Sequence, residues 1–126
     1  MRQSLLIISS QLVSASAFAS QIQINCENNI LNLKGTLERN ENTVTGNMEI
    51  TSLNNPHAEL NGTFPTQGSM KFYPAGSFFR DDTTMIQISG ELDGLRLALK
   101  VLNQSGTLYN AGLAQPMACS VQESAQ

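Results

Sequence analysis

Apolar and polar residues alternate with a period of two along most of the chain after residue 20, where no stretch has a helical period. Such alternation puts every second side chain on one face of a strand. Runs of about five to nine residues bounded by Asn, Gly and Pro are typical of short antiparallel strands. We therefore expect strands joined by tight turns. The residues expected on their apolar faces are Ile22, Ile24 and Cys26; Leu31, Leu33, Gly35 and Leu37; Val44, Gly46, Met48 and Ile50; Ala58, Leu60, Gly62 and Phe64; and, after a turn expected over 65–68, Met70 and Phe72.

The hairpin around Asp93-Gly94 is the one whose register the sequence predicts most sharply. Asp-Gly between two apolar residues favours a two-residue turn of type I′. A slip of one residue would move the apolar side chains to the other face, so the turn and the pattern have to agree. The expected pairs are Leu92 with Leu95, Gly90 with Leu97, Ile88 with Leu99 and Ile86 with Val101.

A short repeat places a glycine in the middle of three expected apolar faces. Gly35, Gly62 and Gly90 each have a large apolar residue two positions before and two positions after. Glycines at such positions let strands coil sharply, which is one way of bending a sheet towards closure. We expect an all-β fold, an up-and-down antiparallel meander of about eight short strands that forms a small closed or nearly closed barrel. A β-sandwich remains the alternative, because a local pattern does not establish closure.

The first 19 residues have the layout of a secretory signal peptide. Arg2 is followed by an apolar stretch and then by Ala17-Phe18-Ala19, a small-x-small cleavage site. Polar residues at 9–11 interrupt the apolar stretch, which is too short to span a bilayer. We expect residues 1–19 to be removed, with a cut after Ala17 as the alternative, and residues 20–126 to form a single domain in the periplasm or outside the cell.

The two cysteines, Cys26 and Cys119, lie near the two ends of the expected domain. An even pair in a small exported domain predicts a disulfide. Closing a loop of about 90 residues stabilises a fold by roughly 4–5 kcal/mol in the chain-entropy model. Because the first and last strands of a closed meander are neighbours, the disulfide and the barrel support each other. A metal site is not expected, since two thiols and the single histidine, His57, fall short of four zinc ligands.

Charge and aromatic content narrow the classes of partner. The chain has a net charge of −3, and no two of its lysines and arginines are adjacent, so we expect no nucleic-acid partner. It contains no Trp, its aromatic content is 6%, and its C-terminus is polar. A membrane-spanning barrel needs aromatic girdles and a final apolar strand. We therefore expect no stable membrane insertion.

No group of residues has the spacing of a catalytic or cofactor site. The sequence has no Gly-x-Ser-x-Gly motif. His57 follows Pro56 at an expected turn, without a partner that would orient it as a general base. Asp81 and Asp82 would point to opposite faces of an extended chain, and no calcium-loop spacing surrounds them. We expect a protein without enzymatic activity and without a cofactor.

One segment gathers most of the aromatic residues. Apart from Tyr109, all aromatic residues after the expected signal peptide lie between positions 64 and 79. Two adjacent phenylalanines cannot both point to one face of a strand, so we expect at least one of them in an exposed loop. Apolar anchors with a polar rim suit a binding surface, here for an unknown protein or for a small apolar ligand at the barrel mouth. The alternative is that this loop folds over an open barrel end as a plug. The candidate binding residues are Tyr73, Phe78, Phe79 and Arg80.

A short motif late in the chain resembles a known family. Ser105-Gly106-Thr107-Leu108-Tyr109, with Gly112 after it, is similar to the Ser-Gly-x-x-Tyr loop of the small periplasmic inhibitors of C-type lysozyme. The resemblance is confined to this motif, and the Trp-containing strand that follows it in that family is missing here. The resemblance implies a disulfide-bearing barrel whose loop at residues 105–109 enters the lysozyme cleft. An inhibitor of a cell-wall hydrolase or of a protease is thus the alternative to a general binding protein.

Overall fold

The computed structural model describes residues 19–53, 61–76 and 78–125. These residues form eight β-strands, so the fold is all-β, as the alternation predicts. Most of the expected signal peptide, residues 1–18, and the segment 54–60 with His57 lie outside the described residues. In the described ranges no helix is long and apolar enough to cross a membrane. The strands are β1 (Ala19–Glu27), β2 (Leu31–Asn40), β3 (Thr43–Ser52), β4 (Gly62–Tyr73), β5 (Thr83–Leu92), β6 (Leu95–Leu102), β7 (Ser105–Asn110) and β8 (Leu113–Ala125).

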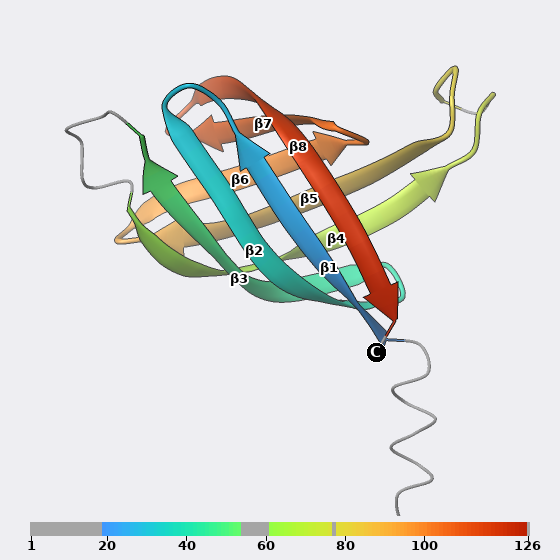
Figure 1. Cartoon of the computed structure of the whole chain (residues 1–126), viewed down its shortest axis with the longest axis horizontal. Coiled ribbons are helices and arrows are strands. Elements are labelled where there is room, and N and C mark those ends of the chain that lie inside the picture. Colours follow the sequence, from blue (N-terminus) through green and yellow to red (C-terminus); the bar gives the residue numbers. More distant parts are fainter. Residues whose placement is uncertain (1–18, 54–60, 77, 126) are drawn as a thin grey trace, which may run out of the picture.

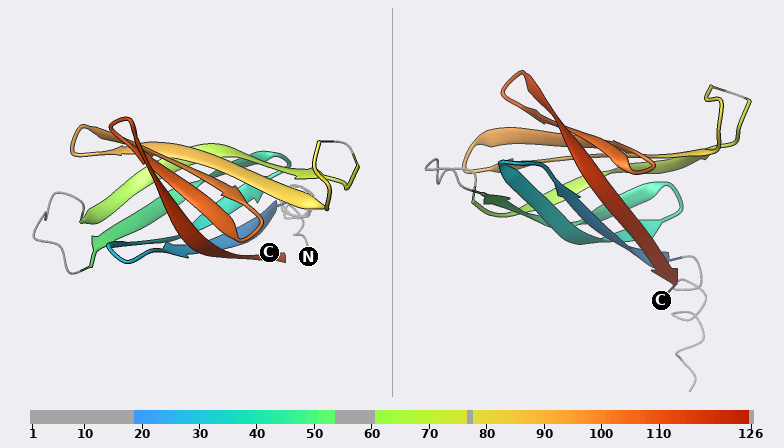
Figure 2. Two further views of the ribbon diagram at one scale, coloured as in Figure 1. Left: turned by 90° about the horizontal axis from the view of Figure 1, so that it is seen from above. Right: turned by 45° about the horizontal axis from the view of Figure 1, so that its top comes forward.

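The strands form an up-and-down antiparallel meander that closes on itself. Each strand pairs with the next one in the chain, and β1 pairs with β8 from Ser20↔Ala125 to Glu27↔Ala118, which completes the ring. Figures 1 and 2 show a flattened barrel, in which the wall of β8, β1, β2 and β3 crosses the wall of β4 to β7. Closure confirms the predicted barrel and excludes the β-sandwich alternative.

The hairpin of β5 and β6 has the predicted register. The pairs run from Met85↔Leu102 to Leu92↔Leu95 and include every pair expected from the Asp-Gly turn. Asp93 and Gly94 have φ values of 52° and 83°, as a type I′ turn requires. The local sequence therefore determines this hairpin.

The turn expected over 65–68 is wrong. β4 runs through these positions without a break and pairs there with β3 and, from Thr66 onward, with β5. Thr66 and Gly68 take inward positions between two buried apolar residues, so the alternation continues through side chains that are not large and apolar. Pro65 is tolerated because the β5 pairing begins only after it, so its missing N–H is not needed there.

Inward-facing glycines let neighbouring strands approach closely. A Cβ added to Gly90 would overlap the carbonyl oxygen of Pro65, and one added to Gly68 would overlap that of Gln87. A larger residue at either position would therefore push β4 and β5 apart. The close approach at Gly90 agrees with the role that the sequence repeat predicts, and Gly68 adds a position outside the repeat.

Apolar side chains fill the interior of the barrel. They come from all eight strands and occupy the inward positions of the alternation. Between Leu33, Phe64 and Leu99 an internal void of about 10 Å³ remains, which is at the lower limit for a single water molecule. An eight-stranded barrel is wide enough either for its own side chains or for one small ligand, and here the apolar side chains of the described residues occupy the interior. The buried apolar residues are Ile22, Ile24, Cys26, Leu31, Leu33, Leu37, Val44, Met48, Ile50, Phe64, Met70, Ile86, Ile88, Leu92, Leu97, Leu99, Val101, Leu108, Met117 and Cys119.

The predicted disulfide joins Cys26 of β1 to Cys119 of β8 across the seam that closes the barrel. The two residues are directly paired in the register, with their Cα atoms 4.0 Å apart, and both are buried. Gly106 of β7 faces them, and a Cβ at this position would overlap Cys119 Sγ. The absent side chain of Gly106 therefore makes room for the disulfide.

An ion pair lies at the end of the barrel where β1 begins and β8 ends. Nη1 of Arg39 lies 3.0 and 2.9 Å from the two carboxylate oxygens of Glu123. Ser20 Oγ donates a hydrogen bond to Glu123 Oε2 (2.5 Å). This hydrogen bond lowers the pKa of Glu123. Partial burial acts in the opposite direction, and the hydrogen bond and charge of Arg39 lower the pKa further. The polar C-terminal segment is thus part of β8 rather than a tail.

Candidate functional site

The hairpin of β4 and β5 extends beyond the barrel and carries the candidate site at its end. β3 pairs with β4 only as far as Ser69, and one further bond runs from the Met70 N–H to the Asn42 carbonyl (2.9 Å). β6 pairs with β5 as far as Met85↔Leu102, so β4 and β5 form a two-stranded ribbon over their last two pairs, Phe72↔Thr84 and Tyr73↔Thr83. Figures 1 and 2 show this ribbon leaving the body of the barrel.

The turn between β6 and β7 supports the base of the ribbon. The Asn103 N–H donates to the Thr84 carbonyl (3.0 Å), and the Thr84 N–H donates to Asn103 Oδ1 (2.9 Å). Asn103 Nδ2 also donates to the Asp82 carbonyl (3.3 Å). Asn103 has a φ of 57°, a left-handed conformation that Asn tolerates better than most residues. One turn residue therefore ties the ribbon to the barrel, and no local sequence pattern marks it.

Aromatic rings pack together at the end of the ribbon. The Tyr73 ring meets Phe78 and Phe79 edge-on, with centroid distances of 5.7 and 5.6 Å. Such pairs contribute about 0.5–1.5 kcal/mol each beyond their burial. Phe78 nevertheless remains 82% exposed, and Phe72, on the opposite face of the ribbon, is 58% exposed. We call Phe72, Tyr73, Phe78 and Phe79 the aromatic tip.

The aromatic tip does not plug the barrel. The ribbon points away from the barrel body (Figures 1 and 2), and the high exposure of Phe78 is that of a ring facing solvent. The plug alternative is therefore wrong for this ring. Phe64, the first aromatic residue of the segment, is instead buried in the core.

Hydrogen bonds within the connection of β4 and β5 fix the shape of the tip. The Gly76 N–H donates to the Phe79 carbonyl (2.8 Å), and the Ala75 N–H donates to Asp82 Oδ1 (2.8 Å). Asp82 thus stabilises the loop rather than forming a pair with Asp81. Arg80 is exposed and has no hydrogen bond or ion pair with any other described residue, so its guanidinium is available to a partner.

Of the four candidate binding residues, the structure brings Tyr73, Phe78 and Phe79 together and places Arg80 beside them in the chain. Their part in binding stays a prediction. The alternation predicts that Phe72 faces the interior. Phe72 does continue the inward side of β4, but it lies beyond the last residue of β4 that pairs with β3, so no neighbouring strand covers its ring and it is exposed. Only the different lengths of β3 and β4 would have indicated this exposure.

No protein family, characterised protein or solved structure matches this chain.

The likeness to the lysozyme-inhibitor loop is not supported by the geometry. Ser105–Asn110 forms β7, which pairs with both β6 and β8 along its length. Gly106 and Leu108 of the motif point into the barrel and are buried. The expectation that residues 105–109 form a loop able to enter a cleft is therefore wrong. Tyr109 points outward and is 43% exposed.

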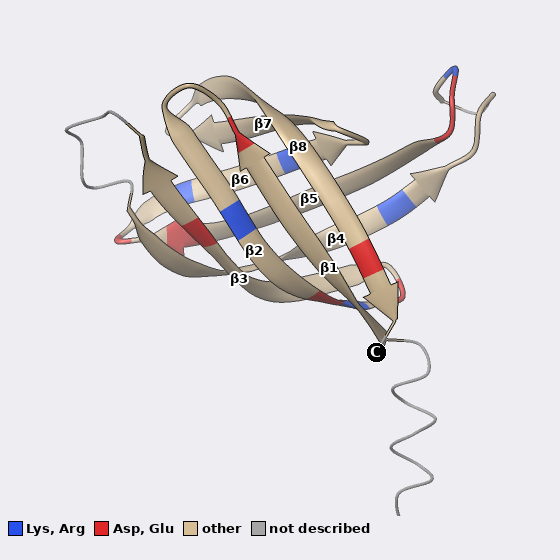
Figure 3. Cartoon of the chain, viewed as in Figure 1, with Lys and Arg blue, Asp and Glu red and all other residues tan. Residues whose placement is uncertain are grey.

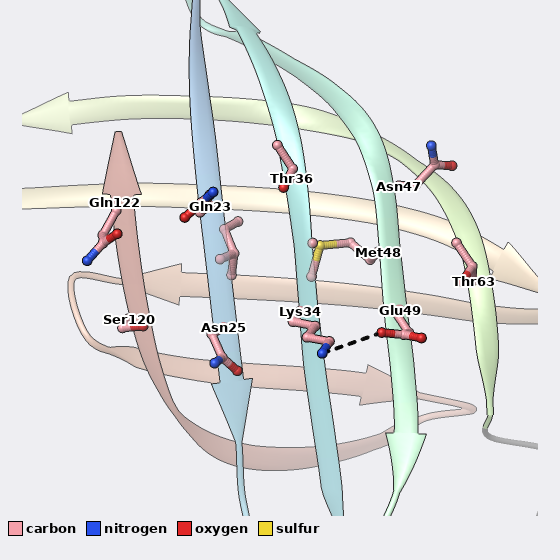
Figure 4. Close-up of a pocket in the computed structure, with 12 residues that line it drawn as sticks. Gln23, Asn25, Lys34, Thr36, Asn47, Met48, Glu49, Thr63, Ser120 and Gln122 are labelled. Carbon is pink, nitrogen blue, oxygen red and sulfur yellow. Dashed lines mark ion pairs between the residues drawn. The ribbon is translucent and has the colours of Figure 1, made fainter. Parts of the chain in front are cut away.

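The outer face of the wall built by β8, β1, β2 and β3 is hollowed into a groove of about 480 Å³ (Figure 4). Amide and hydroxyl side chains line it, together with an exposed ion pair in which Lys34 Nζ lies 3.8 Å from Glu49 Oε1. None of its described lining residues is aromatic. One row of its side chains crosses four strands in register: Gln122, Gln23, Thr36 and Asn47.

The charged residues that the structure describes are spread over the barrel rather than gathered in one place. In the part of the chain that the structure describes, no group of three or more His, Cys, Asp or Glu residues could hold a metal ion. Acidic and basic residues are scattered over the walls (Figure 3), and some of them are paired, such as Arg96 with Glu91 at 4.0 Å. The aromatic tip therefore remains the best candidate for the functional site.

Proposed function

We propose that this protein is an exported, non-enzymatic binding protein that holds a protein partner at its aromatic tip. The observation that carries the proposal is the filled interior. The void among the buried side chains is only about 10 Å³, too small for an apolar ligand, and this favours binding at the surface of the protein. Among the described residues, aromatic rings gather on that surface only at the tip.

The chemistry of the tip suits a protein partner with an apolar pocket. Aromatic side chains and arginine are the residues that most often dominate binding energy at interfaces. Phe78 presents most of its ring to solvent, and Arg80 beside it has an unpaired guanidinium within the described residues. The Tyr73 contacts and the Asn103 hydrogen bonds hold the tip in shape before binding, which lowers the ordering cost of association.

Export is part of the proposal. The buried disulfide agrees with an oxidising compartment, and the layout of residues 1–19 predicts a signal peptide. We propose a mature protein of residues 20–126 in the periplasm or outside the cell. The intact mass of the protein purified from its native source tests this step, since cleavage after Ala19 leaves Ser20 as the first residue. An intact mass that still includes residues 2–17 would contradict it, and one that begins at Phe18 would indicate the alternative cut after Ala17.

The experiment that tests the binding site is a pull-down from the envelope or secreted fraction with oxidised 20–126 as bait. Phe78→Ser removes a ring that is 82% exposed, so the fold should tolerate it. Leu113→Ser is the matched control, because Leu113 is 66% exposed at the turn of β7 and β8, at the other end of the barrel (Figure 1).

We expect a partner that the wild type and Leu113→Ser retain and that Phe78→Ser loses. Equal recovery by all three baits, or recovery by none, would contradict a binding site at the tip. If the partner is a cell-wall hydrolase or a protease, its activity in the presence of the wild type and of Phe78→Ser tests the inhibitor alternative directly.

A further inference from the structure

A depression lies on the outer face of the second wall, and two small residues form its floor. Ser89 of β5 and Ala98 of β6 are directly paired and have the outward phase of their strands. Adjoining hollows of about 730 and 400 Å³ both include these two residues. The depression exists because longer side chains surround the two short ones. They are Gln67, Gln87, Glu91, Arg96, Lys100 and Tyr109.

Tyr109 supplies an open ring at the edge of this depression. It stands in a row with Gln67, Ser89 and Ala98, and its neighbours on the two adjacent strands are Ala98 and Ala114. Side chains stand roughly perpendicular to a sheet. Because both directly paired neighbours are alanines, neither of them extends far enough to cover the ring, in agreement with an exposure of 43%.

The polar side chains around the ring are free to bind. Gln67 and Gln87 make no side-chain hydrogen bond with any described residue, and each amide offers two donors and an acceptor. Arg96 is paired with Glu91. Lys100, between Gln87 and Thr107 in the register, has no acidic partner in the described part of the chain. The depression therefore presents one unpaired positive charge.

We propose that this depression binds an acidic saccharide. A sugar ring has an apolar face of C–H groups and a rim of hydroxyls. The apolar face stacks on the Tyr109 ring, the hydroxyls exchange hydrogen bonds with Gln67 and Gln87, and a carboxylate pairs with Lys100. The two hollows have the volumes typical of small-molecule clefts.

The groove on the first wall provides an internal comparison. It contains similar amides and a lysine, but it has no aromatic residue among its described lining, and its Lys34 is paired with Glu49 (Figure 4). We expect this groove not to bind the same ligand. Lys34→Gln is therefore the matched control for Lys100→Gln.

The test is a titration of oxidised, ¹⁵N-labelled 20–126 with a trimer of galacturonic acid and with a trimer of galactose, followed by amide chemical shifts. We expect the acidic trimer to shift the side-chain amides of Gln67 and Gln87 and the backbone around Ala98. Tyr109→Ala should weaken this binding about fivefold, and Tyr109→Phe should keep it. Lys100→Gln should weaken binding of the acidic trimer about two- to fivefold and leave the neutral trimer unaffected.

Several results would overturn the proposal. They are the absence of shifts with the acidic trimer, shifts confined to the first wall, equal or tighter binding of the neutral trimer, and equal effects of Lys34→Gln and Lys100→Gln. The amide spectrum of each variant shows whether it is folded, and Tyr109→Phe separates loss of the ring from a general disturbance of β7. These outcomes are independent of whether the aromatic tip binds a partner.

Discussion

Replacing Gly106 by alanine isolates the contact between β7 and the disulfide. The added methyl group would overlap Cys119 Sγ, whereas Cys26 Sγ and the Lys100 carbonyl oxygen lie 3.7 Å from it, at ordinary contact distance. The obstacle to an alanine at this position is therefore a single sulfur atom, which is held by its bond to Cys26 and cannot turn away.

The magnitude depends on whether that sulfur is present. In the oxidised protein, forcing a methyl group into the filled core costs about 1–3 kcal/mol. In a Cys26→Ala/Cys119→Ala background the sulfur is gone, and the methyl group occupies the vacated space. Alanine is also favoured over glycine within a strand by about 0.5–1 kcal/mol. We therefore expect Gly106→Ala to lower the free energy of unfolding in the oxidised protein and to raise it slightly without the disulfide.

The assay is urea unfolding of the four proteins of this double-mutant cycle, followed by far-ultraviolet circular dichroism because the chain has no Trp. The coupling energy should be about 2–3 kcal/mol. Loss of the disulfide alone should cost about 4–5 kcal/mol in the chain-entropy model, so a stabilising osmolyte at one fixed concentration keeps all four proteins measurable. An equal cost of Gly106→Ala in both backgrounds would refute the reasoning, and would mean that β7 needs the glycine for its backbone path.

Three further predictions concern a turn, an ion pair and the support of the tip. Ala111, before Gly112 in the turn of β7 and β8, has a φ of 53°, a left-handed conformation that Asn tolerates better than Ala. Ala111→Asn should therefore raise the free energy of unfolding by about 0.5–1 kcal/mol. An unchanged or lower midpoint of thermal unfolding would contradict this. Folding lowers the pKa of Glu123, so its contribution is complete above the ordinary value of 4.5 and is lost as the pH falls through the folded-state pKa. At neutral pH the free energy of unfolding of the wild type should exceed that of Glu123→Gln by less than about 1 kcal/mol. Urea unfolding at a series of pH values should show that this difference vanishes in acid. A difference that stays constant with pH would count against the ion pair. Asn103→Ala should lower the free energy of unfolding by about 1–2 kcal/mol and speed hydrogen exchange at the Thr84 amide. Asn47→Ala, a substitution of an exposed residue, should do neither. Unchanged exchange at Thr84 would show that the ribbon does not depend on Asn103.

Local patterns were sufficient wherever a turn and an alternation agreed. The Asp93-Gly94 turn determines the register of β5 and β6, because any slip would expose the leucines. The disulfide could be predicted for a different reason. Two cysteines on the first and last strands of a meander become neighbours only if the barrel closes, and Cys26 and Cys119 are indeed directly paired.

The failures occurred where side-chain size or tertiary neighbours decide the outcome. Pro65 and Gly68 have the composition of a turn, but β4 continues through them because inward glycines are needed where β4 and β5 approach closely. The motif at 105–109 has the composition of a loop, yet it forms a strand whose Gly106 points into the barrel, where the disulfide leaves no space for a side chain.

The candidate site was predictable only in part. Two adjacent phenylalanines required at least one exposed ring, and Phe78 is that ring. The projection of the tip depends on β4 and β5 being longer than their neighbours, and its support depends on Asn103, which lies on another hairpin. The ion pair of Arg39 and Glu123 likewise joins the second and the last strand, so no local pattern could have indicated it.

The central claim is that this protein acts through the aromatic tip and not through its interior. The measurement that tests it most directly is photo-crosslinking in the cells that make the protein, with benzoylphenylalanine in place of Phe78 or, as the matched control, of Leu113. We predict a covalent adduct of one discrete mass from position 78 and none from position 113. No adduct from position 78, or the same adduct from both positions, would contradict the claim.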